Sequence, residues 1–496
     1  MRLKSQSAME YLMTYGWAIL IIAVVIAVLF DLGIFSSPSF GNSCITQDGF
    51  YCSNPILTSS GALYVNFAQF SSGQMNITGF GCSNSTAAPA YFQDNFIDLQ
   101  PNEQSHVMFP CPTTSGASGT QFIGTLWVKY NTPQVTNVEE EVASIKAHVA
   151  VAQQYYISGY LSGQYIYSQQ SGLLSDTNIG DHGTPPFFPL NGSLMYQLHY
   201  WSGDFIVTSL SGTTLLDMPL VGATGQNMAQ STGYSNGAQY LYLVSSDYGC
   251  GSVCSYLFKI TTSGYNLMGN TLLPGGSWAY FTANDSKNVY LVDGSTISVV
   301  NKDTMAIETS VSGCAAPDGI TLQPDGQYVW VACINSGDVF RINTQTYNAV
   351  QINVYSGGGI IASPDNKFVY TDAGSDIFGI NTSTLQVTRT IPVPTGRGVV
   401  LAMSQDSSTM FAGTTGTIYV INLQAGTYNT IPISCNSCQI GAMTITPNGK
   451  ELLVSEYNTN SGGNGVLYVI NTQTDAVEST ISLPEWVGEY MVMRPI

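Results

Sequence analysis

The stretch Asp325-Gly-Gln-Tyr-Val-Trp-Val-Ala is a turn that leads into an apolar strand. Variants of it recur at Asp365-Asn-Lys-Phe-Val-Tyr-Thr-Asp and Asn448-Gly-Lys-Glu-Leu-Leu-Val-Ser. Each is followed by a second apolar run that ends in a turn, namely Val339-Phe-Arg-Ile-Asn-Thr-Gln-Thr, Ile377-Phe-Gly-Ile-Asn-Thr-Ser-Thr and Leu467-Tyr-Val-Ile-Asn-Thr-Gln-Thr. Self-similarity of this kind indicates a repeat architecture built from small β units.

The spacing of the repeats predicts the type of β unit. Matching strands begin near residues 153, 193, 239, 288, 328, 368, 409 and 450, about 40 to 49 residues apart. This period is typical of one four-stranded propeller blade. The first unit, residues 153–179, shows three strands and no inner one, whereas the last segment, residues 489–496, is typical of an inner strand with nothing after it. Pairing the two closes a ring of eight blades, with seven as the alternative.

Over roughly two thirds of the chain, residues 152–496, these units resemble the YVTN-type β-propeller repeats of archaeal and bacterial surface proteins. The resemblance implies an extracellular propeller domain. A propeller is a scaffold for many functions, so it predicts the fold and leaves the function to be argued from the sites on it.

Composition supports export and argues against nucleic acid. The 496 residues are 44% hydrophobic and only 9% charged, with a net charge of −18. Such a surface repels phosphate, so we expect no nucleic-acid partner. The ten cysteines fall into local groups, which favours extracellular disulfides over metal sites. These disulfide candidates are Cys44, Cys52, Cys82 and Cys111 (connectivity open), then Cys250 with Cys254, Cys314 with Cys333, and Cys435 with Cys438.

The N-terminal segment predicts a membrane-spanning or filament-core helix. Residues 11–30 form an uncharged run of twenty residues, long enough to cross a bilayer. Arg2 and Lys4 precede the run and Asp31 follows it, which places the body outside the cell. Glu10 lies at the edge of the run, where a carboxylate is costly unless it is solvated by headgroups or paired.

The segment at residues 4–30, which begins Lys4-Ser-Gln-Ser-Ala-Met-Glu-Tyr and includes the apolar run, closely resembles the class III signal peptide of archaeal type IV pilin-like proteins. The resemblance implies cleavage by a prepilin peptidase between Ser5 and Gln6, although glycine is usual where Ser5 stands. It also implies that Glu10 pairs with the new α-amino group of a neighbouring subunit in a filament core. On this basis residues 1–5 are a leader and residues 6–35 the helix.

Residues 40–151 show short alternating strands typical of a small β-sandwich. The clearest are Ala62-Leu-Tyr-Val-Asn-Phe, Met75-Asn-Ile-Thr, Gly124-Thr-Leu-Trp-Val-Lys-Tyr and Val142-Ala-Ser-Ile-Lys-Ala-His-Val. The order of residues 76–82 (Asn-Ile-Thr-Gly-Phe-Gly-Cys), residues 124–130 and a last valine-rich strand resembles the β-domain of archaeal pilin-like proteins. We expect the acidic run at residues 139–141 to form a solvated turn before the last strand. The predicted fold class is therefore all-β apart from one N-terminal helix.

Few residues point to chemistry. Of the histidines, His106, His148, His182 and His199, only His182 lies in a loop beside an aspartate, and an ordinary hydrogen-bonded histidine is favoured there. Catalytic, metal and cofactor motifs are not apparent, so we predict no catalytic residue, no metal and no cofactor. Five sequons permit glycosylation, at Asn76, Asn84, Asn191, Asn284 and Asn381.

The function predicted from these observations is a pilin-like or membrane-anchored adhesion protein at the cell surface. Its propeller head would recognise a glycan or a protein through uncharged amide and aromatic loops, without enzymatic activity. Its other partners would be prepilin peptidase, neighbouring subunits and the membrane. Two alternatives stay open: a membrane-tethered extracellular propeller enzyme, either glycan-active or a dehydrogenase, and a structural protein associated with an S-layer.

Overall fold

The computed structural model describes residues 42–158 and 253–494, apart from gaps at 71–72, 74, 91, 103, 113–119, 134, 152, 277–278, 395–398, 434–437, 459–463 and 486–489. Between these two ranges it describes residues 164–168, 172–177, 188, 194–198, 204–210, 213–220, 227–228, 234–236 and 240–247. Residues 44–496 form one compact unit. Within the described residues, no helix is long and apolar enough to span a membrane. The predicted helix at residues 6–35 lies outside them.

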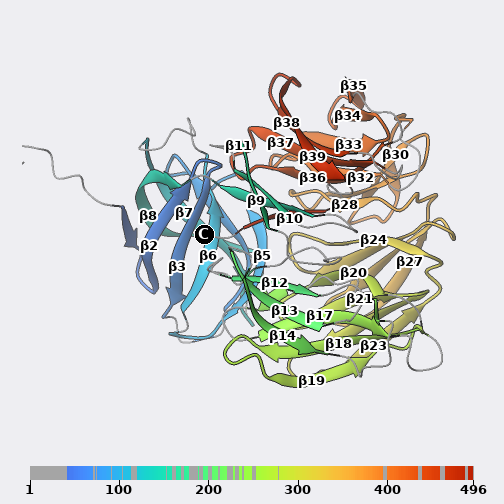
Figure 1. Ribbon diagram of the computed structural model, residues 1–496, viewed down its shortest axis with the longest axis horizontal. Coiled ribbons are helices and arrows are strands. Elements are labelled where there is room, and N and C mark those ends of the chain that lie inside the picture. The colour runs from blue at the N-terminus through green and yellow to red at the C-terminus, as the bar shows by residue number, and fades with distance from the viewer. Residues whose placement is uncertain are drawn as a thin grey trace, which may run out of the picture. The chain divides into compact units, whose positions relative to one another are not determined.

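The N-terminal part of the described chain is an eight-stranded β structure (Figure 1). Its hydrogen-bonded path runs β5-β4-β7-β8-β2-β3-β6, and β1 pairs with β8. The strands are β1 (Ser43–Thr46), β2 (Phe50–Thr58), β3 (Ala62–Gln69), β4 (Met75–Ser83), β5 (Gln93–Leu99), β6 (Gln104–Pro110), β7 (Gln121–Asn131) and β8 (Val138–Val151). The long strand β8 joins the two halves of this path, because it pairs with β7 on one side and in parallel with β2 on the other.

The two halves pack against each other through one aromatic core. Phe67 of β3, Phe80 of β4 and Phe109 of β6 are fully buried. The rings of Phe80 and Phe109 meet edge-on with centroids 4.9 Å apart, and the Phe67 ring lies about 6 Å from both. Edge-to-face pairs of this kind add to the stabilisation that burial of the rings provides. The region is therefore a two-layer sandwich.

The structure corrects one detail of the sandwich. Glu139, Glu140 and Glu141 were expected in a turn, but they lie within β8, opposite β7. Glu139 pairs with Lys129 at 3.5 Å, and Glu140 accepts a 2.7 Å hydrogen bond from the Tyr130 hydroxyl. Cross-strand partners of this type make an acidic run compatible with a strand, which its composition alone does not indicate.

Disulfides occur in both domains. The four cysteines of the sandwich pair as Cys44–Cys52 and Cys82–Cys111. In the propeller Cys314 pairs with Cys333, and Cys254 is also disulfide-bonded. Cys250 and Cys435 lie outside the described residues, as does the side chain of Cys438. Disulfides are typical of proteins that fold in an oxidising compartment.

Eight further sheets follow the sandwich and form the eight blades of a β-propeller. Blade 1 holds β9 (Gln154–Ser158), β10 (Gln164–Ser168), β11 (Gly172–Thr177) and β40 (Tyr490–Met493); blade 2, β12 (Leu194–Leu198), β13 (Asp204–Ser209) and β14 (Thr214–Pro219); blade 3, β15 (Asn227–Met228), β16 (Tyr234–Asn236), β17 (Tyr240–Asp247), β18 (Cys254–Thr261) and β19 (Leu267–Leu272); blade 4, β20 (Ala279–Asn284), β21 (Asn288–Asp293), β22 (Thr296–Asn301) and β23 (Ile307–Ser312).

Blade 5 holds β24 (Pro317–Leu322), β25 (Tyr328–Cys333), β26 (Asp338–Asn343) and β27 (Ala349–Asn353); blade 6, β28 (Ile360–Ala362), β29 (Phe368–Asp372), β30 (Ile377–Asn381) and β31 (Val387–Ile391); blade 7, β32 (Val400–Met403), β33 (Thr409–Thr414), β34 (Thr417–Asn422) and β35 (Thr427–Pro432); blade 8, β36 (Cys438–Ile445), β37 (Glu451–Asn458), β38 (Asn464–Asn471) and β39 (Val477–Glu485). The prediction of an all-β fold with an eight-bladed propeller is confirmed.

The ring closes as the sequence predicted. The last strand, β40, pairs antiparallel with β9, the first strand of the propeller. Blade 1 thus takes its inner strand from the C-terminal end of the chain and its other three strands from residues 154–177. Closure by hydrogen bonding removes the open edge that each terminal strand would otherwise present.

The asparagine that recurs after the third strand of a blade, often within Ile-Asn-Thr, has a local physical cause. At the turn between the third and fourth strands of a blade, the asparagine Oδ1 accepts hydrogen bonds from the backbone N–H groups two and three residues ahead. This happens at Asn301, Asn343, Asn381, Asn422 and Asn471. A short side-chain acceptor stabilises such a turn without help from neighbouring strands, which is why asparagine recurs there.

Neighbouring blades share their cores. On β25, Val331 packs with Tyr290 and Val299 of blade 4. The residue before it, Trp330, points the other way and packs with Val369 of blade 6. Successive side chains of a strand point to opposite faces, so a strand in the middle of a blade is buried on both faces. The unbroken apolar runs of the repeats follow from this packing.

Buried tyrosines make the fold sensitive to alkali. Burial raises the pKa of Tyr167 to about 12, and burial together with the Glu140 carboxylate raises the pKa of Tyr130 to about 12. In the unfolded chain a tyrosine ionises near pH 10. We therefore expect full stability below about pH 10 and a progressive loss as the pH rises through about 12. Urea unfolding midpoints at pH 9, 11 and 12 measure this, and Tyr167→Phe should weaken the decline. Equal midpoints at all three pH values would contradict it.

Candidate functional site

A groove lies between the sandwich and blade 5. Its cavity volume is about 530 Å³, within the range of small-molecule sites. Its walls come from strands β4 and β7 with the loop after β7 on one side, and from two turns of blade 5 on the other. The lining residues are Asn76, Asn131, Thr132, Pro133, Thr136, Asp325, Gly326, Gln327, Asn343, Thr344 and Gln345. We call this the junction groove.

A smaller pocket extends the junction groove toward blade 4. It has a volume of about 40 Å³ and shares Asn76, Asn131, Gly326 and Gln345 with the junction groove. The turn at residues 285–287 of blade 4 adds Asp285 and Lys287 to its lining. A ligand in the junction groove therefore has access to two successive blades as well as to the sandwich.

The elements that hold these side chains are rigid. Asn76 of β4 and Asn131 of β7 are directly paired in register, which places both amides at one point on the sandwich. On the propeller side, Gln345 stands in an asparagine-capped turn, where its own backbone N–H bonds to Asn343 Oδ1 at 3.0 Å. Its side chain is exposed and projects from that fixed turn. Sites held by strands and capped turns need little reordering when a ligand binds.

One acceptor in the junction groove has no partner. Asn76 Oδ1 is buried and makes no hydrogen bond within the described part of the chain. By contrast, the other groove amide has its oxygen engaged, because Asn131 Oδ1 accepts from the backbone N–H of Asn137 at 2.7 Å. A buried acceptor without a donor costs about 1–3 kcal/mol. Asn76 thus adds a strained polar environment to the sandwich wall of the junction groove.

The Asp325 carboxylate, the charged group in the lining of the main groove, already accepts hydrogen bonds from its own turn. Asp325 accepts from the backbone N–H of Gln327 at 3.0 Å and from Gln323 Nε2 at 3.0 Å. Burial raises the pKa of its carboxyl, and these hydrogen bonds with the charge of Lys129 partly offset that effect. Asp325 thus serves chiefly to hold its turn, and the remaining lining is uncharged.

Carboxylates near the entry to the inner strands have structural partners too. Asp293 Oδ2 accepts from the backbone N–H of Gly275 at 2.7 Å, and Asp372 Oδ1 accepts from that of Gly359 at 2.6 Å. These bonds anchor the loops that lead into β20 and β28. The described residues contain no group of three His, Cys, Asp or Glu side chains that would hold a metal ion.

The structure places some of the predicted site residues. His148 lies on the outer face of β8, where its Nε2 is 3.0 Å from Gln121 Nε2. The processing and assembly residues Ser5, Gln6 and Glu10 lie outside the described residues, as do His182, His199 and Asn191. The side chain of His106 is likewise not described.

The sequons differ in their surroundings. Asn84 is exposed in a bend after β4. Asn76 is in mid-strand with its Oδ1 buried, Asn284 Oδ1 accepts from Lys302 Nζ at 3.1 Å, and Asn381 caps a turn. A glycosylated asparagine must present its amide at the surface.

We therefore expect an N-linked glycan at Asn84 and none at Asn76, Asn284 or Asn381, when the protein comes from cells that glycosylate exported chains. Glycopeptide mass mapping tests this expectation, with Asn84→Gln as the control that removes the modification. A glycan at Asn76 would show that the sandwich strand is accessible before folding and would contradict the argument from exposure.

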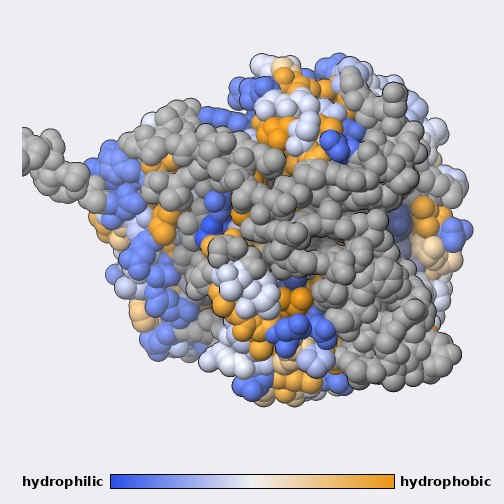
Figure 2. Space-filling view, viewed as in Figure 1, coloured by the Kyte–Doolittle hydropathy of each residue, from blue (hydrophilic) through white to orange (hydrophobic). Residues whose placement is uncertain are grey.

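Sequence reasoning identified the asparagine-rich turns but not the junction groove. Asp325 was expected to be a turn residue and is one, but the turn also forms one wall of the groove. The expected rim of tyrosine and tryptophan is not part of the groove lining, and Trp330 is fully buried. On the face drawn in Figure 2, hydrophobic residues are scattered among hydrophilic ones. No repeat or spacing in the sequence signals a site whose walls come from two domains.

The comparisons with known proteins support the fold. A family model described as a domain of unknown function (DUF5074) matches residues 261–431. A search of curated proteins finds no match. Among solved structures, "Dihydro-heme d1 dehydrogenase NirN in complex with DHE" is 12% identical over 69% of this chain and 75% of that one, with a TM-score of 0.53. Apo AztD from Citrobacter koseri is 10% identical over 69% of this chain and 98% of that one, with a TM-score of 0.47. At 12% identity, the similarity to the first of these structures shows the propeller fold alone.

Proposed function

We propose that the protein is a binding protein displayed at the cell surface, and that the junction groove is its ligand site. The observation that carries this proposal is the polar lining of the junction groove, in which amide and hydroxyl side chains of the sandwich and of blade 5 converge. One of these residues, Asn76, has a buried Oδ1 without a donor among the described residues. The disulfides in both domains are consistent with an extracellular location.

The lining favours a neutral, hydroxyl-rich ligand such as a glycan. Amide and hydroxyl side chains can both donate to and accept from sugar hydroxyl groups. An anionic ligand would be repelled by the net charge of −18, and Asp325, the only carboxylate in the main groove lining, is held by its own turn. Because no aromatic residue is among the lining residues described, recognition would rest on hydrogen bonds.

Display would come from the N-terminal segment. We propose that prepilin peptidase cuts after Ser5 and that the helix then anchors the body in the membrane or joins neighbouring pilin-like subunits through Glu10. The resemblance of residues 4–30 to class III signal peptides supports this proposal. A role as a binding protein, rather than an enzyme, is supported by the structural use of Asp293, Asp325 and Asp372.

The display mechanism predicts the mature N-terminus. Protein isolated from native membranes or shed filaments should begin at Gln6, as read by mass spectrometry of the intact chain. Glu10→Ala should leave the propeller folded and reduce incorporation into filaments, because the carboxylate that pairs with the neighbouring α-amino group is lost. A chain that begins at Met1, or unchanged filament content in Glu10→Ala, would contradict the pilin-like mechanism without touching the binding site.

The ligand site predicts a contrast between two identical turns. Gln345 and Gln473 stand at the same position of the sequence Asn-Thr-Gln-Thr in blades 5 and 8, and both side chains are exposed, but only Gln345 lines the junction groove. For a neutral oligosaccharide that binds the full-length protein, Gln345→Ala should weaken binding about twofold to tenfold, the loss expected for one hydrogen bond. Gln473→Ala should have no effect.

Titration calorimetry of the detergent-solubilised chain with a panel of neutral oligosaccharides measures this contrast. Equal losses in the two variants would place the ligand elsewhere on the propeller. If no neutral oligosaccharide binds, the glycan proposal is wrong, and a protein ligand or a purely structural S-layer role takes its place.

A further inference from the structure

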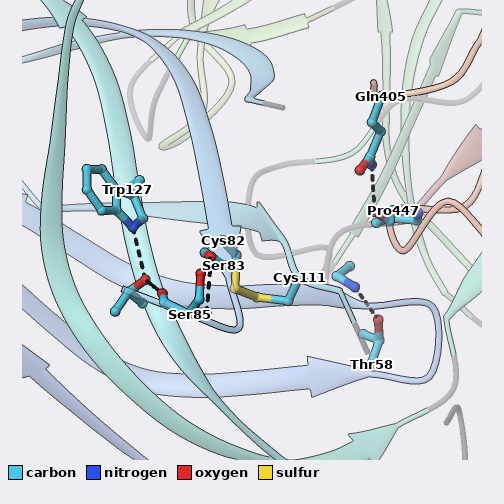
Figure 3. Close-up of a disulfide and its surroundings, with 10 residues drawn as sticks. Thr58, Cys82, Ser83, Ser85, Cys111, Trp127, Gln405 and Pro447 are labelled. Atoms are coloured by element: carbon cyan, nitrogen blue, oxygen red, sulfur yellow. Dashed lines mark hydrogen bonds between the residues drawn. A yellow bond between two sulfur atoms is a disulfide. The ribbon is translucent and has the colours of Figure 1, made fainter. Parts of the chain in front are cut away.

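The turns on one face of the propeller form a chain of hydrogen bonds from blade to blade. Each turn joins the inner strand of a blade to its second strand. The backbone N–H of Asp325 in blade 5 bonds to Asn366 Oδ1 in blade 6 at 2.9 Å. The backbone N–H of Asp365 in blade 6 bonds to Ser407 Oγ in blade 7 at 3.1 Å. Gln405 Nε2 in blade 7 bonds to the carbonyl oxygen of Pro447 in blade 8 at 2.6 Å (Figure 3).

This series of hydrogen bonds between turns cannot continue from blade 8 to blade 1 in the same way. The inner strand of blade 1 is β40 and its second strand is β9, and they come from opposite ends of the propeller sequence. No turn joins them, because the strand that precedes β9 in the chain is β8 of the sandwich and not β40. Blade 1 therefore lacks the turn that every other blade of this series supplies to its neighbour.

The sandwich occupies the missing position. The tight turn between β2 and β3 consists of residues 59–61. In this turn the Ser60 carbonyl oxygen accepts a 2.8 Å hydrogen bond from the backbone N–H of Asn448 in blade 8. Ser60 is fully buried. Gly61 has a φ of +82°, and a Cβ there would clash with the Cys111 carbonyl oxygen of the sandwich and lie 2.8 Å from Asn448 Cβ in blade 8. Glycine is thus required both for the turn and for its close approach to blade 8.

The same turn contacts the closure strands of blade 1. Ser59 Oγ accepts from the backbone N–H of Gln153 at 3.3 Å, and Ser60 Oγ donates to Gln153 Oε1 at 3.4 Å. Gln153 is fully buried, and its Nε2 donates to the carbonyl oxygen of Arg494, directly after β40, at 2.6 Å. The Arg494 backbone N–H in turn bonds to the Gln154 carbonyl oxygen at 3.0 Å.

Tyr64 completes this contact from the sandwich. On β3 the side chains of Leu63 and Val65 enter the sandwich core, so Tyr64 between them points to the opposite face. It is nevertheless only 2% exposed. Its hydroxyl lies 3.2 Å from the Arg494 carbonyl oxygen, to which it donates, and 3.4 Å from Gln153 Oε1.

The sandwich holds this turn in a fixed shape. Thr58 Oγ1 accepts from the backbone N–H of Ala62 at 3.0 Å, and the Gly61 carbonyl oxygen accepts from that of Cys111 at 2.7 Å. Cys111 is itself tied to β4 through the disulfide with Cys82. The turn is therefore ordered before it meets the propeller, which lowers the entropic cost of docking.

From these contacts we infer that the sandwich turn at residues 59–61, together with Tyr64, acts as the missing turn of blade 1 and locks the ring closure. The propeller has a docking surface at its closure strands, and the partner that fits it is the sandwich of the same chain. Tension applied through the N-terminal segment would reach the propeller at its closure strands.

Hydrogen exchange of the full-length chain tests this inference, with the amides of β9 and β40 as the readout. Tyr64→Phe removes only the hydroxyl that reaches Gln153 and Arg494, so exchange in β9 and β40 should become about threefold to tenfold faster. Gly61→Ala should accelerate it at least tenfold, because the added Cβ is driven against both the Cys111 carbonyl oxygen and Asn448 and the backbone is strained.

Matched controls separate the lock from general loss of sandwich stability. Gly49→Ala also places a side chain at a positive φ, +90°, in a sandwich turn, but a Cβ there meets no atom within 4 Å. Tyr130→Phe removes a sandwich hydroxyl that bonds to Glu140 instead. Both controls should leave β9 and β40 at the wild-type rate. Wild-type exchange there in Tyr64→Phe overturns the inference, as does equal acceleration in the controls; Tyr64→Phe decides the matter if Gly61→Ala fails to fold.

Discussion

The pairing of β40 with β9 is the contact on which the rest of the propeller depends. Each blade buries both faces of its middle strands against its neighbours, so a blade without a neighbour would expose an apolar face to water. A ring satisfies every blade, but only when its first and last strands meet. The four residues of β40 therefore maintain the ring of eight cores that neighbouring blades share. They are held by pairing with β9 and by the hydrogen bonds around Gln153 and Arg494.

This closure explains why the sandwich and propeller are joined so tightly. Strand β8 of the sandwich ends at Val151 and β9 begins at Gln154, so very little chain separates the domains. A flexible tether would leave the closure strands to hold each other alone. The buried Gln153 instead bonds to the sandwich turn on one side and to Arg494 on the other, which links the covalent junction and the ring closure in one polar cluster. Buried polar clusters are stable only when their members are satisfied, so this junction is sensitive to single substitutions.

The fixed junction also creates the junction groove. Asn76 and Asn131 stand on the sandwich, while Gln327 and Gln345 stand on turns of the propeller. Neither domain encloses the groove alone. A rigid arrangement of the two domains would present these amides to a ligand in advance, and the entropic cost of binding would be lower for that reason. In our proposal, the strands and the disulfides serve this geometry, and the ligand is recognised by groups that carry no charge.

The sequence alone determined the propeller, its blade number and the origin of its closing strand, because each repeat carries its own turn signals. Asn343 and Asn471 cap their turns through local hydrogen bonds. The apolar run at Tyr328–Cys333 marks a strand that is buried in the blade. The acidic residues 139–141 were misjudged because their partners, Lys129 and Tyr130, lie on another strand. Only the tertiary structure decided the junction groove and the role of the turn at residues 59–61. Both depend on contacts between segments separated by tens to hundreds of residues, such as Ser60 with Asn448, and no local pattern encodes such distances.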